Sequence, residues 1–170
     1  MAAHRLWSHK IIAHTPALTM EYLKLKQKAD ACNSEARQVL LDSSFLFIPV
    51  NFKIDIFREL SRLLDGRFEP VVLSATLREL QKLSRSTSTK LRKQAGIALK
   101  LAGQCRVQEA TEARHESHDD LIVRIAHKMG FCVATNDKAL RKRLRNLQVP
   151  VIYLRQKTKL AAVGALECTP

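Results

Sequence analysis

Short, uninterrupted apolar runs alternate with helical patterns along this chain from residue 39 onward. The runs at 39–41, 70–73, 131–134 and 149–154 contain almost no polar residues, as expected for strands that are buried on both faces. Between them, apolar residues recur at helical spacing, for example in 54–64. Strands of this kind, separated by helices, predict an α/β fold with a central parallel sheet covered by helices on both faces.

Four acidic residues stand where a strand passes into a polar turn, or on the helices next to such places: Asp42, Glu79, Asp119 and Asp137. They are conspicuous because the chain has only 16 acidic residues against 29 Lys and Arg. In open parallel sheets the ligand site lies beyond the carboxyl ends of the strands. Converging carboxylates repel one another, and oxygen ligands select hard cations such as Mg²⁺ or Mn²⁺. The sequence therefore predicts a divalent metal site.

Helical spacing distinguishes two adjacent acids. On the helix expected to begin at Ser117, Asp119 shares the apolar face with Ile122, whereas Asp120 shares the polar face with Arg124. Asp120 also stands three residues after Ser117, the spacing of a capping box. We expect Asp119 to face the site and Asp120 to cap the helix.

Each acid also has a purely structural explanation when it is taken alone. Asp42 could cap the following loop, Asp119 and Asp137 could cap helices, and Glu79 could be an ordinary surface residue beside the apolar stripe of its helix. The four together, with Asp42 and Asp137 expected at the same sheet edge, are less easily explained in this way.

The formal net charge of +13 and the isoelectric point near 10 indicate a polyanionic partner. Aromatic residues make up only 5% of the chain, which argues against base stacking as the main mode of binding. Residues 138–159 contain eight Lys and Arg and no acid, and 80–108 contain seven. On the helix at 138–147 leucines take the core face. The residues predicted to bind the polyanion are Lys138, Arg141, Lys142, Arg143 and Arg145; a merely solvated basic face is the alternative.

The four cysteines, Cys32, Cys105, Cys132 and Cys168, form no CxxC pair. Their spacing argues against a zinc ribbon and against a disulfide requirement. His115 and His118 flank Glu116 without an accompanying cysteine, so we do not favour a zinc site there. The absence of an apolar run of membrane-spanning length or a signal sequence predicts a cytoplasmic protein with no membrane partner.

Four segments then resemble a known family. In this order, "VLLDSS", "PVVLSATLREL", "HDDLIVRIAHKMG" and "CVATND" resemble the four acidic motifs of the PIN-domain ribonucleases, over about residues 38–156. "FLFIPVNFKIDIFRELSRLL" and "ATNDKALRKRLRNLQVPVIYL" look most like the PIN nucleases related to small-subunit ribosomal RNA processing factors.

The resemblance implies a three-layer α/β/α sandwich that hydrolyses RNA with Mg²⁺ or Mn²⁺. Asp42, Glu79, Asp119 and Asp137 would then be the catalytic, metal-binding acids, and Ser43, Thr135 and Asp120 would support them. PIN domains often dimerise, so the resemblance leaves a homodimer open. Residues 1–37 have no counterpart in the family core. We expect 1–37 to be a partly disordered extension containing an amphipathic helix at 17–31, 38–156 to be the nuclease domain, and 157–170 to be a tail.

The leading functional hypothesis is a metal-dependent endoribonuclease in ribosomal RNA processing, acting on pre-rRNA or the small-subunit precursor. One alternative is a ribonuclease toxin of a toxin–antitoxin pair. Another is a non-catalytic RNA-binding scaffold, which an intact set of four acids disfavours.

Overall fold

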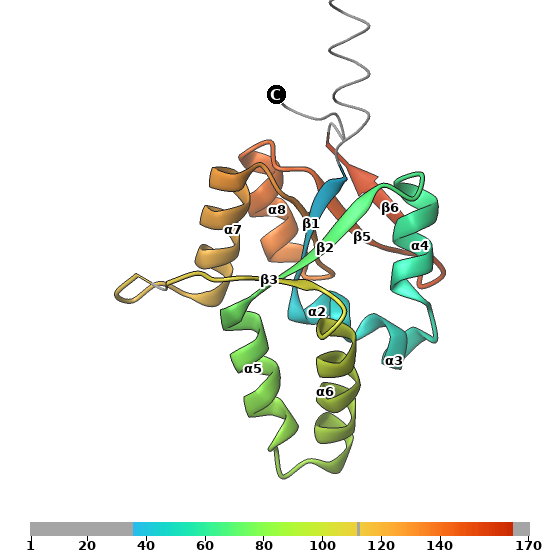
Figure 1. The fold of residues 1–170 in the computed structure, drawn as a ribbon, viewed down its shortest axis with the longest axis vertical. Coiled ribbons are helices and arrows are strands. Elements are labelled where there is room, and N and C mark those ends of the chain that lie inside the picture. Colours follow the sequence, from blue (N-terminus) through green and yellow to red (C-terminus); the bar gives the residue numbers. More distant parts are fainter. Residues whose placement is uncertain (1–35, 112, 165–170) are drawn as a thin grey trace, which may run out of the picture. The chain divides into compact units, whose positions relative to one another are not determined.

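The computed structural model describes residues 36–111 and 113–164; the predicted extension and its helix at 17–31 lie outside this range apart from residues 36 and 37. The described chain forms one mixed sheet flanked by helices (Figure 1). The strands are β1 (Arg37–Leu41), β2 (Phe68–Leu73), β3 (Arg106–Gln108), β4 (Cys132–Ala134), β5 (Val151–Arg155) and β6 (Lys159–Val163). The helices are α2 (Ser43–Leu46), α3 (Ile48–Phe52), α4 (Ile56–Leu63), α5 (Ser74–Ser84), α6 (Thr89–Ala102), α7 (His118–Met129) and α8 (Lys138–Asn146).

The strand order is β3-β2-β1-β4-β5-β6, and the first five strands in this order are parallel. Along the chain the sheet grows from β1 outward to β2 and β3, and then returns to the other side of β1 with β4 and β5. The order therefore reverses between β1 and β4. The carboxyl ends of these two strands define the switch point, where doubly wound sheets bind ligands.

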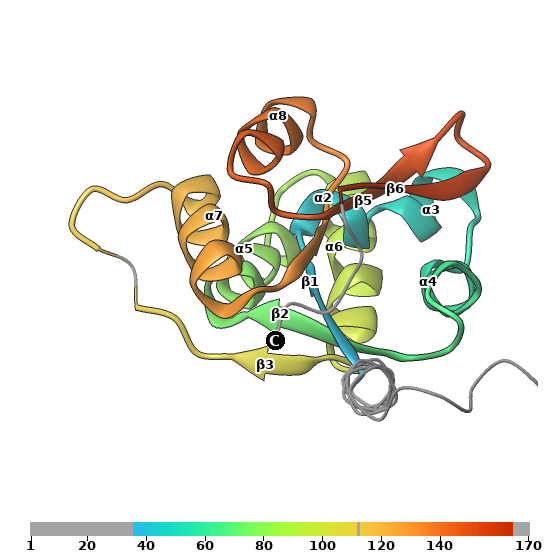
Figure 2. The same ribbon diagram turned by 90° about the horizontal axis from the view of Figure 1, so that it is seen from above.

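Alternate residues of β1, β2, β4 and β5 enter two separate cores. Val39 and Leu41 of β1 pack on one face with residues of α2, α4 and α6, and Leu40 packs on the other with residues of α7 and α8. All three residues are fully buried. Figure 2 shows α7 and α8 on one side of the sheet and α3, α4 and α6 on the other. The predicted fold, strands buried on both faces in a three-layer α/β/α sandwich, is confirmed.

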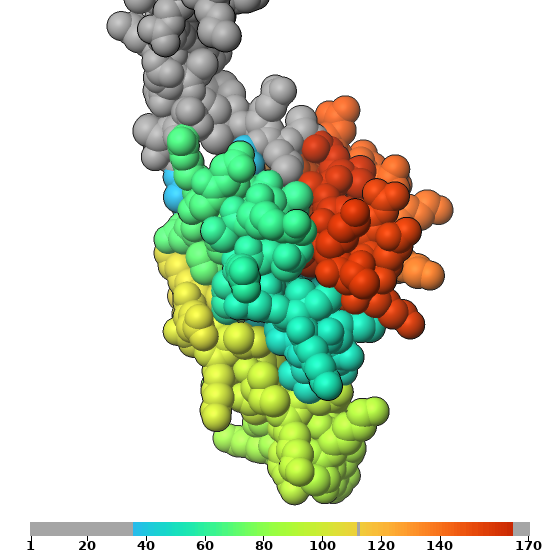
Figure 3. All heavy atoms as spheres, turned by 90° about the vertical axis from the view of Figure 1, so that its right-hand side faces the viewer, coloured from blue at the N-terminus to red at the C-terminus, as the bar shows by residue number. Residues whose placement is uncertain are grey.

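Strand β6 differs from the sequence prediction, in which the strand at 149–154 is the last one and residues 157–170 form a tail. Instead Lys159–Val163 pairs antiparallel with β5. The connecting turn has positive φ at both central residues, Gln156 (53°) and Lys157 (59°), and Thr158 N donates to Arg155 O at 3.2 Å. Such turns suit hairpins but usually contain Asn-Gly or Asp-Gly, so this sequence carries no hairpin signal. Figure 3 shows the surfaces of α3 and α4 adjoining that of β5 and β6.

The segment 43–52, which follows β1, forms the short helices α2 and α3. The reason is burial: Phe45, Leu46 and Ile48 are at most 1% exposed and fill the core against α6. Lys53, with φ 56°, ends α3 in the left-handed region. Within the described ranges, none of the helices is long and apolar enough to cross a membrane.

Candidate active site

Asp42 ends β1 at the switch point and is only 5% exposed. Two hydroxyl groups donate to its Oδ2: Ser44 Oγ at 2.6 Å and Thr135 Oγ1 at 2.8 Å. Ser43 Oγ makes a longer bond to Oδ1, at 3.4 Å. Asp42 N also donates to Ala134 O at 3.0 Å, across the β1–β4 junction. The carboxylate is therefore held by both strands that flank the switch point.

Ser44 is a residue of the site that sequence reasoning missed. The sequence prediction names Ser43 as the supporting serine, although Ser44 Oγ lies 2.6 Å from an Asp42 carboxylate oxygen and Ser43 Oγ lies 3.4 Å from one. Ser44 Oγ also accepts from Asn136 N at 3.0 Å and lies 3.2 Å from Thr135 Oγ1. One side chain thus links the start of α2 to the turn after β4. The second serine of the "DSS" sequence was the feature from which this hydrogen bond to Asp42 could have been predicted.

The turn after β4 positions a second acid. Asp137 N donates to Thr135 Oγ1 at 3.1 Å, and Asp137 Oδ1 accepts from Ala139 N at 2.6 Å and Leu140 N at 2.9 Å. Asp137 is therefore the N-cap of α8, in agreement with the structural explanation of this acid. Both capping bonds use Oδ1. The cap also fixes this carboxylate at the edge where Asp42 lies.

Asp120 caps α7, as its spacing from Ser117 predicted. Asp120 forms a reciprocal capping box with Ser117: Asp120 N donates to Ser117 Oγ at 3.1 Å, and Ser117 N donates to Asp120 Oδ2 at 3.2 Å. Hydrogen bonds from Ser117 and then from Arg143 lower the pKa of Asp120 to about 2. For Asp119 the pKa is raised, first by partial burial and then by the charges of Asp42 and Asp137. Two of the other predicted acids thus act electrostatically on Asp119.

Glu79 lies on α5 and meets His118, the first residue of α7. His118 Nε2 is 3.2 Å from the fully buried hydroxyl of Thr76 and 3.7 Å from Glu79 Oε2. A separation of 3.7 Å is too long for a hydrogen bond, so it counts as an ion pair only if His118 is protonated. Although 42% of the Glu79 side chain is exposed, its Oε2 is buried and has no hydrogen-bond partner in the described structure. This oxygen is available to a ligand.

The donor chemistry of these acids fits a hard cation. A positive charge near Asp119 would offset the burial and the charges of Asp42 and Asp137 that raise its pKa, and a cation beside Glu79 Oε2 would give that oxygen a partner. Within residues 36–111 and 113–164, however, no three acidic, His or Cys side chains lie close enough to hold a metal ion as they stand.

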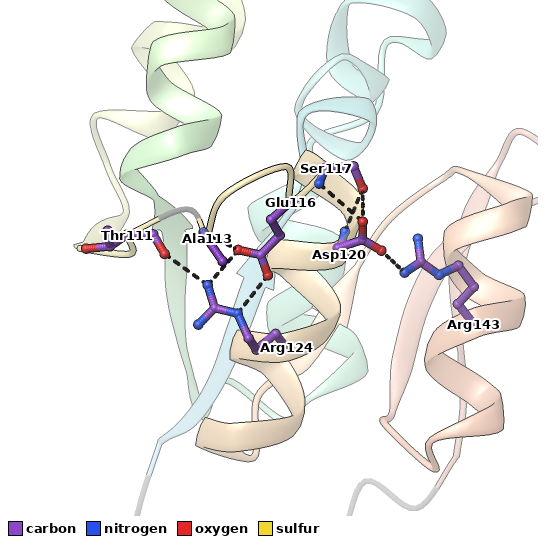
Figure 4. A network of polar contacts seen from close by, with 7 residues as sticks. All are labelled: Thr111, Ala113, Glu116, Ser117, Asp120, Arg124 and Arg143. Carbon is purple, nitrogen blue, oxygen red and sulfur yellow. Dashed lines mark hydrogen bonds and ion pairs between the residues drawn. The ribbon is translucent and has the colours of Figure 1, made fainter.

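The loop before α7 is held by a network that the sequence did not reveal (Figure 4). Arg124 binds Glu116 through two bonds, Nε to Oε1 at 2.7 Å and Nη2 to Oε2 at 2.8 Å, and Nη2 also donates to Thr111 O at 2.9 Å. Glu116 Oε2 accepts from Ala113 N at 2.9 Å. Glu116 is thus engaged with Arg124, and His115 is exposed.

The five predicted RNA-binding residues fall into two groups. Arg143 Nη2 donates to Asp120 Oδ1 in a short contact that connects α8 to α7, as Figure 4 shows. The other four, Lys138, Arg141, Lys142 and Arg145, line a pocket beside β5 and β6. One basic residue therefore contacts the capping acid Asp120 of α7, and the remainder share a different face of α8.

This α/β sheet, with carboxylates gathered at its switch point, has the architecture of an acidic-site nuclease domain. Residues 39–157 match the family described as "PIN like domain", and the chain belongs to this family. The resemblance seen in the four sequence motifs is confirmed.

Relatives fall in two groups. Over 128 residues the chain is 31% identical to "Ribonuclease VapC4" of Methanocaldococcus jannaschii, covering 75% of this chain and 97% of that protein. It is also 31% identical over 112 residues to "rRNA-processing protein FCF1" of Saccharomyces cerevisiae, covering 65% of this chain but only 55% of FCF1. Among solved structures, the "PIN domain endonuclease Utp24" matches with a TM-score of 0.61 and 26% identity, over 78% of this chain and 96% of that one.

Proposed function

We propose that this chain is a metal-dependent endoribonuclease that acts in ribosomal RNA processing. The observation that carries the proposal is the acidic edge at the switch point, where burial and the charges of Asp42 and Asp137 raise the pKa of Asp119. Asp119 is therefore less readily ionised than an ordinary carboxyl, and a bound cation would stabilise its charged form. The relatives supply the reaction class, because VapC4 is named a ribonuclease and Utp24 an endonuclease.

Asp42, Glu79, Asp119 and Asp137 would hold Mg²⁺ or Mn²⁺. When bound, such a cation lowers the pKa of a coordinated water and stabilises the charge that develops on the phosphate and the leaving oxygen. The protein supplies the orientation. Ser44 and Thr135 hold Asp42 Oδ2 by hydrogen bonds, and the N-terminus of α8 holds Asp137. The capping box at Ser117 fixes the start of α7 and so positions Asp119 in its first turn. A separate protein base is not required.

The RNA substrate follows from the charge and from the relatives. A net charge of +13 attracts a polyanion, and the acid-free basic face of α8 starts immediately after Asp137. The rRNA assignment draws on the similarity to FCF1, and the chain spans about half of that protein.

A second candidate function is that of a ribonuclease toxin controlled by a partner antitoxin. The specific observation in its favour is length, since the chain covers 97% of VapC4. Growth arrest on expression, reversed by a co-expressed neighbouring gene, would favour the toxin. Defined cuts in pre-rRNA without growth arrest would favour rRNA processing.

The test is incubation of the purified protein with pre-ribosomal RNA and with generic structured RNAs in the presence of Mn²⁺, followed by mapping of the cuts. Asp42→Asn should abolish cleavage and weaken Mn²⁺ binding measured by calorimetry. Asp65→Asn is the matched control, because it removes the same charge from an exposed position with φ 52°, which Asn tolerates. Equal cleavage by both variants would contradict the proposal.

A further inference from the structure

One face of α8 carries four basic residues and forms one wall of a pocket. Lys138, Arg141, Lys142 and Arg145 follow one another at positions i, i+3, i+4 and i+7, so they share a face of the helix. The pocket that they line has a volume of about 160 Å³. None of the four forms an ion pair with an acid in the part of the chain that the structure describes. Their charge is available to a ligand.

Residues from β5 and β6 form the opposite wall: Val151, Tyr153 and Val163. The guanidinium carbon of Arg141 lies 4.4 Å from the centroid of the Tyr153 ring, which is the distance of a cation–π contact. This contact fixes the plane of the guanidinium. Arg141 Nε is buried and has no hydrogen-bond partner in the described structure. The pocket therefore combines fixed positive charge with an aromatic and apolar wall.

Arg143 provides an internal comparison on the same helix. It stands outside the i, i+3, i+4, i+7 series, and its guanidinium is bonded to Asp120 rather than open to the pocket. The helix thus directs one cation, Arg143, towards Asp120 of α7 and the other four towards β5 and β6. A uniformly solvated basic helix would show no such division.

We infer that this pocket binds one phosphate and its attached nucleoside from an RNA strand, outside the acidic site. The inference rests on the proposed function for the identity of the strand as substrate. Phosphate oxygens are the preferred partners of Arg in bidentate geometry and of Lys as a point charge. The volume of about 160 Å³ is well below the roughly 300–1,000 Å³ typical of pockets for drug-sized ligands, so it suits the phosphate and sugar of a single nucleotide unit.

The position of the pocket lets it determine which phosphodiester bond of the strand reaches the proposed cleavage site. Lys138 directly follows the capping acid Asp137, and Arg145 stands about 10 Å further along the helix axis. A nucleotide held here places the strand beside the acidic edge at a fixed offset. The positive charge alone would suit an acidic peptide equally well. The wall of Val151, Tyr153 and Val163 favours a ligand that also has a ribose or base to bury.

The test is binding of a short fluorescent single-stranded oligoribonucleotide to the full-length protein in EDTA, so that no cleavage is required. Lys142→Gln/Arg145→Gln changes two exposed residues of the pocket. Arg58→Gln/Lys128→Gln removes the same charge from exposed positions on α4 and α7. The pocket variant should bind at least tenfold more weakly than the control variant. The slope of its affinity against salt concentration, on logarithmic axes, should become shallower by about 0.7 for each phosphate that it no longer binds.

Arg141→Lys tests the contact between the guanidinium and Tyr153 rather than the charge of the pocket. The charge is retained, but the planar group on Tyr153 is removed, so we expect a several-fold loss of RNA affinity. Equal affinity of the pocket and control variants, or tighter binding of a polyglutamate peptide than of an oligoribonucleotide with the same charge, would overturn the inference. Normal pocket-dependent binding by a protein that cuts no RNA would overturn the proposed nuclease function alone.

Discussion

Thr135 Oγ1 donates to Asp42 Oδ2 at 2.8 Å, and this single hydrogen bond joins the ends of β1 and β4 across the switch point. Thr135 is fully buried and Asp42 nearly so. The same hydroxyl oxygen accepts from Asp137 N at 3.1 Å. One threonine therefore positions two of the proposed metal-binding acids.

Thr135→Val keeps the shape of the side chain and removes this hydroxyl. We expect the free energy of unfolding to fall by about 1.5–3 kcal/mol, because the variant lacks a hydrogen bond to a buried charged group. Cleavage should fall as well, since the Asp42 carboxylate keeps its bonds from the two serines but loses the one from Thr135. Urea denaturation measures the first effect, with Thr158→Val in the exposed hairpin turn as the control. Equal stability of the two variants would show that the hydroxyl bond contributes little.

Asp119→Asn and Asp120→Asn should have opposite effects on stability. The raised pKa of Asp119 means that the folded state binds its proton more tightly than the unfolded state does. Its contribution to stability is therefore full below the ordinary value of 3.8 and is lost as the pH rises through the folded-state pKa. At neutral pH without metal, Asp119→Asn should melt above the wild type, and the difference should vanish below pH 3.8.

For Asp120 the pH dependence of its contribution to stability has the opposite sign. Its pKa is lowered to about 2, so its contribution is present above 3.8 and is lost as the pH falls towards 2. Asp120→Asn should melt below the wild type at neutral pH and approach it near pH 2. Thermal melts across this pH range decide both cases.

Mn²⁺ should place the melting temperature of the wild type above that of Asp119→Asn. The wild type should gain more thermal stability from Mn²⁺ than Asp119→Asn does, because the variant lacks a charged ligand. The variant should also lose cleavage, whereas Asp120→Asn should keep most of it. If Mn²⁺ raises both melting temperatures equally, Asp119 is not a ligand.

The sequence predicts features that depend on local patterns. The strands at 39–41 and 131–134 are predictable because burial on both faces leaves an uninterrupted apolar run. The capping box of Ser117 and Asp120 is predictable because its spacing is fixed within one helical turn. Strand β6 escapes prediction because its turn uses Gln156 and Lys157 in place of the usual Asn-Gly.

Side-chain contacts across elements could not be predicted in the same way. Ser43 and Ser44 are equivalent in the sequence, and only the geometry at the start of α2 brings Ser44 onto Asp42 Oδ2. Likewise, the bond from Arg143 to Asp120 depends on how α8 packs beside α7. Helical phase placed Arg143 on the surface, but it could not show that an acid of another helix would bind it.

Cys105 and Cys132 should react slowly with thiol reagents in the folded protein. Burial raises the pKa of each thiol to about 12, so the reactive thiolate is scarce at pH 8. Cys32 and Cys168 lie outside the described residues, so the experiment uses Cys32→Ser/Cys168→Ser. Iodoacetamide labelling followed by mass spectrometry should show protection that urea removes. Rapid labelling without denaturant would contradict the burial, and a lower melting temperature of the wild type in reductant would contradict the prediction that no disulfide is needed.

Arg124 should control the order of the loop that leads into α7. Its two bonds to Glu116 lower the pKa of that carboxyl to about 2, and the Glu116 side chain is 9% exposed. Arg124→Gln removes the pair and the bond to Thr111 O, so amide hydrogens of 113–117 should exchange faster while those of β1 and β4 remain protected. Arg58→Gln serves as the charge control. Because the loop sets where α7 begins, cleavage should fall together with the protection of the loop. Full activity with a loop that exchanges freely would show that Asp119 is positioned by the capping box at Ser117 alone.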